Sequence, residues 1–152
     1  MNEIKVREAA FDEPGVQRLV AEAMAELSRR YGGSGDDTPV APSDFAPPKG
    51  AFVVASVGEE LVGCAGWRRH GEDAELKRMF TTEAARGQGV ARRVLTAIEE
   101  SARAAGCKRV ILETGDKQPE AIALYIKCGY EQIEDFGYYK DEVGVLSFAR
   151  VL

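Results

Sequence analysis

The sequence predicts an α/β fold in which helices cover a mixed β-sheet. Short apolar runs with strand character alternate with segments whose apolar residues recur at helical spacing. A glycine-rich turn, RGQGVA, stands between one such strand and a strongly amphipathic segment. A chain of 152 residues, 45% of them apolar, can bury one substantial core, so we expect a single domain over residues 1–152.

The N-terminal part of the chain predicts a strand, a helix and a long loop. Ile4–Ala9 alternates well enough for a strand. Pro14 follows two acidic residues and suits a first helical turn, and the apolar residues after it keep a 3.6-residue period to about Arg30. Tyr31–Gly50 holds four glycines and four prolines, which excludes regular structure over most of its length. It is either an ordered wall of a binding site or a disordered excursion.

Three strand-like runs follow the loop. Ala51–Val57 and Leu61–Arg68 are separated by a glycine-containing turn and predict a hairpin. Ala74–Thr81 is the third run, after the turn HGED. These runs predict a β-meander.

The C-terminal half predicts two helices and three strands. A helix from Val90 to near Gly106 precedes Arg109–Thr114, a short apolar strand that we expect to be parallel and buried. The remaining predicted elements are a short helix from Pro119 to Cys128, a strand at Tyr130–Ile133 and a strand at Val143–Leu152. We expect the last strand at a sheet edge, where pairing with a second copy would give a homodimer.

Composition limits the classes of partner. The net charge is −5, and 25 acidic residues outnumber 20 lysines and arginines, which argues against nucleic acid. No apolar window is long enough for export or membrane insertion, so we expect a cytoplasmic protein. Cys64, Cys107 and Cys128 lack the spacing of a zinc site or disulfide framework. His70, the single histidine, lies in a polar turn and is expected at the surface.

The stretch Arg86–Leu95 predicts an anion site. It opens an amphipathic helix, whose first-turn N–H groups and positive dipole end attract anions. Gly87 and Gly89 lack Cβ atoms, so successive amides can approach a diphosphate, and Arg86 and Arg92 can add positive charge.

Two other phosphate motifs fit less well. A Walker A loop is excluded because no Gly-Lys-Ser/Thr follows at the required offset. A dinucleotide fingerprint shares the G-x-G and has Glu113 downstream, but its third glycine position is Arg92.

A third motif accounts for more residues. Arg86–Ala91 (RGQGVA) resembles the Arg/Gln-x-x-Gly-x-Gly/Ala signature of the GNAT superfamily of N-acetyltransferases. Glu75–Thr81 (ELKRMFT) looks like the fourth strand of that family, and Pro119–Tyr130 (PEAIALYIKCGY) looks like its Ala-x-x-Leu-Tyr-x-x-x-Gly-Tyr/Phe segment. The resemblance is strong from about Ala51 to Ile133, whereas Tyr31–Gly50 has no motif that aligns.

The resemblance implies a GNAT-like acyl-CoA N-acyltransferase fold, with a mostly antiparallel sheet and one splayed parallel pair, Glu75–Thr81 and Arg109–Thr114. It implies acetyl-CoA as cosubstrate, no metal, and direct transfer in a ternary complex to a primary amine of a small molecule or peptide. The pantetheine would run along Met79–Thr81, at the end of the strand Glu75–Thr81. The pyrophosphate would lie on the backbone amides from Gly87 to Ala91. The residues implied in acetyl-CoA binding are Met79, Phe80, Thr81, Arg86, Gly87, Gln88, Gly89, Val90, Ala91 and Arg92.

The resemblance also implies catalytic roles. Tyr125 matches the tyrosine that serves as general acid toward the departing thiolate, although it could also be a packed tyrosine with a structural role. A backbone N–H near Met79 or Phe80 would polarise the thioester carbonyl. Glu75 and Glu113, on the two strands of the splayed pair, are both candidates for the general base.

The acceptor is less defined by the sequence. Trp67, Tyr138 and Tyr139 could line an acceptor pocket, and Asp36 and Asp37 could attract a cationic amine. For each residue we favour the simpler interpretation, with Trp67 in the core and the aspartates in solvent.

Two other function classes stay open. One is a non-catalytic acyl-CoA-binding sensor module, and the other is a fragment of a nucleotide-binding oxidoreductase. Tyr125 argues against the first, and the missing third glycine argues against the second.

Overall fold

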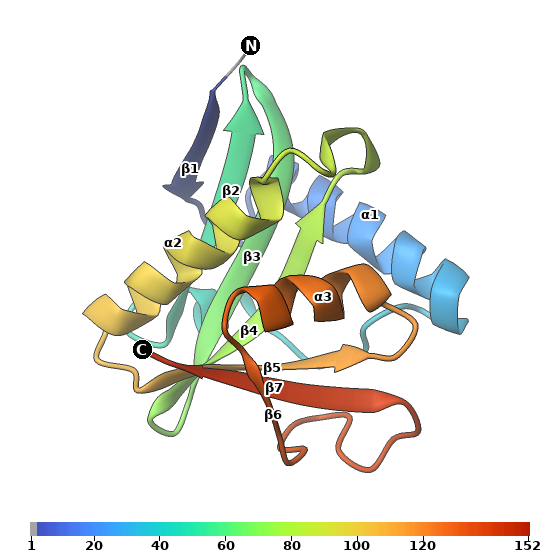
Figure 1. The fold of residues 1–152 in the computed structure, drawn as a ribbon. Coiled ribbons are helices and arrows are strands. Elements are labelled where there is room, and N and C mark those ends of the chain that lie inside the picture. Colours follow the sequence, from blue (N-terminus) through green and yellow to red (C-terminus); the bar gives the residue numbers. More distant parts are fainter. Residues whose placement is uncertain (1–2) are drawn as a thin grey trace.

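The computed structural model describes residues 3–152. One seven-stranded sheet has the spatial order β1-β2-β3-β4-β5-β7-β6 (Figure 1). The strands are β1 (Ile4–Glu8), β2 (Gly50–Val57), β3 (Glu60–His70), β4 (Asp73–Thr81), β5 (Arg109–Gly115), β6 (Glu131–Ile133) and β7 (Val145–Val151). The helices are α1 (Pro14–Tyr31), α2 (Val90–Ala104) and α3 (Pro119–Lys127), with short 3-10 turns at η1 (Pro42–Phe45) and η2 (Glu83–Ala85).

Helices cover both faces of the sheet, with α1 behind it and α2 and α3 in front (Figure 1). Neighbouring residues of β2 alternate between two apolar clusters, as the period of a strand requires. Phe52 and Val54 pack with Leu19 of α1, whereas Val53 belongs to the cluster that contains Ile98 of α2. The regular 3.6-residue spacing in the two long helices therefore arises from burial against the sheet.

The predicted order of elements is confirmed, with boundaries that differ by a few residues. The prediction for the last strand was wrong. β7 lies inside the sheet, paired antiparallel with β5 on one side and with the short β6 on the other, so Val143–Leu152 is not an edge strand. The residues of β7 do not show whether it lies at the edge of the sheet or inside it. Its position depends on the connection that precedes it, which places β6 on its outer side. An exposed edge at β7 therefore no longer supports a homodimer, which stays a prediction.

β4 and β5 form a parallel pair that opens along its length. Only two residue pairs join the strands, Ala74 with Val110 and Glu75 with Ile111, and beyond them the strands diverge (Figure 1). A β-bulge on β4, opposite the stretch between Cys64 and Gly66 of β3, lies at Arg78 and Met79, beyond the last residue of β4 that pairs with β5. The expectation of a splayed parallel pair is confirmed.

The bulge is centred on Arg78. Its φ of 58° is in the left-handed region, which a residue with a side chain rarely adopts. An extra residue in one strand bends it and redirects the side chains that follow. The C-terminal end of β4 stays paired with β3, and within residues 3–152 its edge facing β5 has no ladder hydrogen bonds.

The loop Tyr31–Gly50 is an ordered wall and not a disordered excursion. Phe45 is buried against Phe52, with ring centroids 5.5 Å apart. The carbonyl of Pro39 accepts a hydrogen bond of 2.8 Å from Arg68. The loop therefore crosses the α1 face of the sheet at a fixed position.

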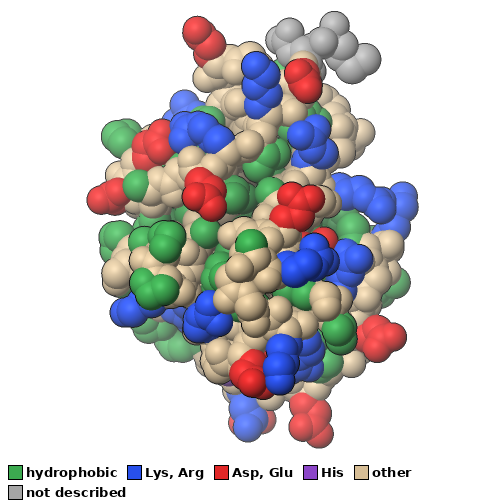
Figure 2. Space-filling view, turned by 90° about the vertical axis from the view of Figure 1, so that its left-hand side faces the viewer, with side chains coloured by type: hydrophobic (Ala, Val, Ile, Leu, Met, Phe, Trp, Pro, Cys, Tyr) green, Lys and Arg blue, Asp and Glu red, His purple; other side chains and the backbone are tan. Residues whose placement is uncertain are grey.

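The charges on the surface and the polarity of the helices agree with the amino-acid composition. On the face shown in Figure 2, basic and acidic side chains are interspersed. Over residues 3–152, no helix combines the length and the apolar character that crossing a bilayer requires.

Candidate active site

A pocket of about 450 Å³ opens where β4 and β5 diverge. Its walls come from α1, the Tyr31–Gly50 loop, the two splayed strands, α3 and the segment before β7. Among the predicted catalytic residues, Tyr125 and Glu113 line this pocket, and so does Met79. Residues from opposite faces of the sheet therefore meet in one pocket, which passes through the gap between the strands.

Tyr125 of α3 reaches the gap from the α2 side. Its ring packs against Tyr130 and Phe148, with centroids 5.7 and 6.3 Å away, and the residue is 6% exposed. The hydroxyl lies 3.8 Å from the Met79 sulfur, a weak acceptor, so it has no strong partner among residues 3–152. Burial raises the pKa of the phenol, which keeps Tyr125 a neutral hydrogen-bond donor.

Glu113 of β5 carries an unsatisfied oxygen. Its Oε2 accepts a hydrogen bond of 3.0 Å from the backbone N–H of Tyr139, whereas Oε1 is buried without a partner in the described chain. Burial raises the pKa of this carboxyl, and the Tyr139 N–H and the charge of Lys77 only partly oppose that shift. A carboxyl with a raised pKa and a free oxygen in a pocket is suited to accept a proton.

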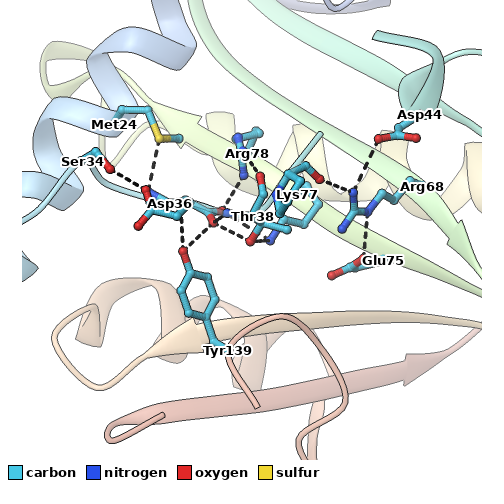
Figure 3. Close-up of polar contacts among 12 residues, drawn as sticks. Met24, Ser34, Asp36, Thr38, Asp44, Arg68, Glu75, Lys77, Arg78 and Tyr139 are labelled. Carbon is cyan, nitrogen blue, oxygen red and sulfur yellow. Dashed lines mark hydrogen bonds and ion pairs between the residues drawn. The ribbon is translucent and has the colours of Figure 1, made fainter. Parts of the chain in front are cut away.

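Glu75, the other candidate base, is engaged elsewhere. Its Oε1 accepts a hydrogen bond of 3.0 Å from Arg68, whose guanidinium also lies 3.5 Å from Asp44 (Figure 3). Glu75 is 3% exposed and does not line the pocket. Its carboxylate anchors the loop to the sheet through Arg68, whereas Glu113 lines the pocket.

Asp36 joins the loop to β4 and to the segment before β7. Its carboxylate lies 2.6 Å from Arg78 and 3.3 Å from Lys77 (Figure 3). It also accepts hydrogen bonds from the Thr38 hydroxyl at 2.6 Å and the Tyr139 hydroxyl at 2.9 Å. Burial alone would raise the pKa of Asp36, but Lys77, Thr38 and Arg78 together lower it to about 2. The expectation that Asp36 is a solvated turn residue was wrong.

Asp36→Asn is expected to lower the free energy of unfolding at pH 7 by about 3 kcal/mol, because Lys77 and Arg78 then lose their shared carboxylate in a buried site. The pKa of Asp36 is about 2 in the folded chain against 3.8 as the ordinary value, so its ionisation stabilises the fold above about pH 4 by about 2 kcal/mol. That contribution is lost as the pH falls through the folded pKa.

Urea unfolding at pH 7 and at lower pH values measures both effects. Asp37→Asn, one residue later and exposed, is the matched control and should change stability by less than about 0.5 kcal/mol. Equal losses in the two variants would contradict the role assigned to Asp36.

The glycine turn has the backbone geometry of an anion site. Gly87 and Gly89 have φ values of 79° and 86°, and Gly89 is the N-cap of α2. No side chain caps the first turn of α2, so its amides keep free N–H groups. Arg86 holds the turn in place, because it donates to the Thr81 carbonyl at 3.1 Å and pairs with Glu26 of α1 at 2.7 Å.

Of the three aromatic residues considered for an acceptor pocket, one lines the pocket and two do not. Trp67 is in the core, 2% exposed, with its indole N–H bonded to Ser101 at 2.9 Å. Tyr139 lines the pocket, whereas Tyr138 is 55% exposed and outside it. His70 is exposed, as expected.

The sequence reasoning missed Lys77 and Arg78 as site residues. Strand alternation would send one of them into the core, which is an unfavourable place for an unpaired cation. Two adjacent cations between Leu76 and Met79 of β4 therefore indicate a bulge, which places both at the pocket. The partner, Asp36, could not be identified in this way.

Within residues 3–152, the structure has no group of three or more His, Cys, Asp or Glu side chains placed to hold a metal ion. The ionisable groups that line the pocket are phenols, carboxylates and two cations.

Comparison with known proteins agrees with this geometry. The model of the acetyltransferase (GNAT) family matches residues 7–130. An IAA acetyltransferase of Azospirillum brasilense is 42% identical over 97 residues, which cover 62% of this chain and 63% of that protein, less than two thirds of its length. The uncharacterized N-acetyltransferase YjgM of Escherichia coli is 32% identical over 135 residues, 81% of this chain and 78% of that protein.

Solved structures share the fold. A protein described as an acyl-CoA N-acyltransferase from Klebsiella pneumoniae has a TM-score of 0.82 and 26% identity, over 98% of this chain and 97% of that one. A GNAT family acetyltransferase from Elizabethkingia anophelis, with acetyl-CoA bound, has a TM-score of 0.73 and 17% identity over 100% of both chains. The family model covers most of the sequence and the fold agrees over almost all of it, so the chain belongs to the GNAT family of acetyltransferases.

Proposed function

We propose that the chain is an acetyl-CoA-dependent N-acetyltransferase that acetylates a primary amine by direct transfer in a ternary complex. The observation that carries this proposal is the pocket between the splayed strands, which brings Tyr125 and Glu113 together from opposite faces of the sheet. A carboxyl with a free oxygen can serve as the general base, and a neutral phenol as the general acid, in acetyl transfer to an amine.

The residues of the chain fit acetyl-CoA. The uncapped first turn of α2, with Gly87 and Gly89 before it, offers N–H groups to the pyrophosphate. The β5-facing edge of Met79–Thr81 has no ladder partner, so it is free to pair with the amides of a pantetheine arm. The Elizabethkingia anophelis structure, which has the same fold, contains acetyl-CoA and supports this assignment. Acetyl-CoA supplies the activated acetyl group.

Two side chains and one backbone N–H have separate roles in the transfer. Glu113 accepts a proton from the attacking amine, directly or through water, while the new C–N bond forms. A backbone N–H near Met79 or Phe80 stabilises the negative charge on the carbonyl oxygen. Tyr125 donates its O–H to the sulfur as the C–S bond breaks, and a hydrogen bond stabilises the thiolate even though full proton transfer from a phenol of raised pKa is unfavourable.

Gly89→Ala is expected to weaken acetyl-CoA binding roughly tenfold. An added Cβ would meet no atom of residues 3–152 within 4 Å, so it would occupy the open space over the α2 amides. Its φ of 86° also makes any side chain there cost about 1–2 kcal/mol of stability. Isothermal titration with acetyl-CoA measures the first effect and urea unfolding measures the second.

Gly106→Ala is the matched control. Gly106 has a φ of 83° and equally open surroundings, but it lies beyond the C-terminal end of α2. It should lose the same stability and keep the dissociation constant for acetyl-CoA. Weaker binding in both variants would mean that the effect arises from strain in α2.

The proposed function is tested by thiol release from acetyl-CoA with amino acids, polyamines, aminoglycosides and short peptides, and with a control that lacks amine. Release that depends on one class of amine supports the proposal. Binding of acetyl-CoA without release from any amine would instead favour a non-catalytic acyl-CoA sensor, and failure to bind acetyl-CoA would contradict both.

A further inference from the structure

The cations of the pocket outnumber the carboxylate that pairs with them. The side chains of Lys77 and Arg78 are each 6% exposed, and both line the pocket. Their shared partner is Asp36, whose low pKa gives it one negative charge. The cluster of these three side chains therefore carries one excess positive charge out of water, where an unpaired charge is unfavourable.

The hydrogen-bonding capacity of Asp36 is already used. Its Oδ1 accepts from the Thr38 N–H at 3.0 Å, the Thr38 hydroxyl at 2.6 Å and the Tyr139 hydroxyl at 2.9 Å. Its Oδ2 lies 2.6 Å from Arg78 and 3.3 Å from Lys77 (Figure 3). A carboxylate has about four lone-pair sites, so Asp36 has no capacity for another donor.

Lys77 and Arg78, in contrast, have N–H groups that are not committed to Asp36 or Thr38. Apart from its bond to Asp36, Arg78 donates to the Thr38 carbonyl at 2.9 Å, which leaves part of its five N–H groups uncommitted. Lys77 donates to the Thr38 hydroxyl at 3.1 Å and has three N–H groups. The spare donors belong to residues of the pocket wall.

Glu113 does not pair directly with these cations in the described residues. No ion pair joins it to Lys77 within 4.0 Å in the described residues, and its Oε1 has no partner. The charge of Lys77 lowers the pKa of Glu113 and so partly opposes the effect of burial, but Glu113 forms no direct ion pair with either cation among the described residues. An anion on a bound molecule would therefore meet two cations with free donors on the same pocket that holds the candidate base.

We propose that the acceptor is a small amine that carries a carboxylate, as a free amino acid does, and that Lys77 and Arg78 bind that carboxylate while the amine faces Glu113. This inference rests on the proposed function and names the class of its acceptor. The planar guanidinium fork of Arg78 matches a carboxylate. Asp37 and Glu142 are exposed at the pocket and can attract the protonated amine from solvent before it reaches Glu113.

Paired substrates test the inference. Initial rates are compared for amino acids and for amines that lack only the carboxylate, such as tyrosine with tyramine and tryptophan with tryptamine. We expect kcat/KM to be roughly 10- to 100-fold higher for the carboxylate member of the productive pair. An aminoalkylphosphonate series extends the comparison to a phosphate-like anion.

Variants locate the effect. In Lys77→Gln the preference within a pair should fall severalfold or more, whereas Lys77→Arg should keep most of it. Lys108→Gln removes the same charge from an exposed ion pair with Glu72 and should keep the full preference. Lys77→Gln leaves one cation for the single carboxylate Asp36, so the variant is expected to fold. Should it not fold, competitive inhibition of the wild-type protein by the carboxylic acid that lacks the amine provides the second measurement.

The outcomes separate the two proposals. Equal kcat/KM within every pair would overturn the carboxylate assignment but leave the acetyltransferase function intact, and a preference for phosphonates over carboxylates would also overturn it. A preference that survives in Lys77→Gln would remove Lys77 from the site. Absence of both acetyl-CoA binding and turnover would contradict the proposed function itself.

Discussion

Tyr125→Phe is expected to lower kcat at saturating amine by about 100-fold, with little change in the KM for acetyl-CoA. The substitution removes one hydroxyl, and with it the donor that stabilises the departing thiolate. The ring still packs against Tyr130 and Phe148, and within the folded chain the hydroxyl makes only a weak hydrogen bond to the Met79 sulfur at 3.8 Å. Steady-state thiol release and thermal unfolding together measure the effect.

Tyr130→Phe is the matched control for this prediction. The Tyr130 hydroxyl donates to Glu99 at 2.7 Å in the core, so its loss should lower the free energy of unfolding by about 1–3 kcal/mol. Tyr130 does not line the pocket, and kcat should stay near the wild-type value. If Tyr125→Phe loses stability and keeps kcat, its hydroxyl has a structural role and the general acid lies elsewhere.

Glu113→Gln is expected to lower kcat by about 100-fold and to remove the acid limb of its pH profile. A general base acts only when ionised, so kcat at saturating amine should fall as the pH drops through the pKa of Glu113. That pKa is raised by burial, which brings the fall to a higher pH than for an ordinary glutamate. Glutamine keeps the size of the side chain but cannot accept the proton as a carboxylate does.

Glu75→Gln decides between the two candidate bases. Glu75 lies on β4 and is bonded to Arg68, so its substitution should lower stability and preserve the shape of the pH profile. Loss of the acid limb in Glu75→Gln, with the limb retained in Glu113→Gln, would exchange the two assignments. The pH profiles are measured at saturating amine so that ionisation of the free amine does not contribute.

The order of the elements and the glycine turn could be predicted from the sequence. The spacing of apolar residues in α2, the prolines that begin α1 and α3, and the glycines at 87 and 89 act between near neighbours along the chain. Such local preferences need no knowledge of the remaining structure. The candidate roles of Tyr125 and Glu113 were likewise predicted from the segments in which they lie, and they stay predictions.

The Asp36 cluster depended on tertiary structure. Asp36 and Arg78 are 42 residues apart, and they meet because the loop crosses the sheet beside the bulge of β4. The choice of Glu113 over Glu75 likewise depended on which carboxylate had Arg68 beside it, and the inner position of β7 depended on the connection through β6. The sequence by itself determined the elements and the glycine turn before α2, because periodicity and turn chemistry are local. Only the tertiary structure decided which charges are paired, because an ion pair depends on distances between segments that strand register and the bulge bring together.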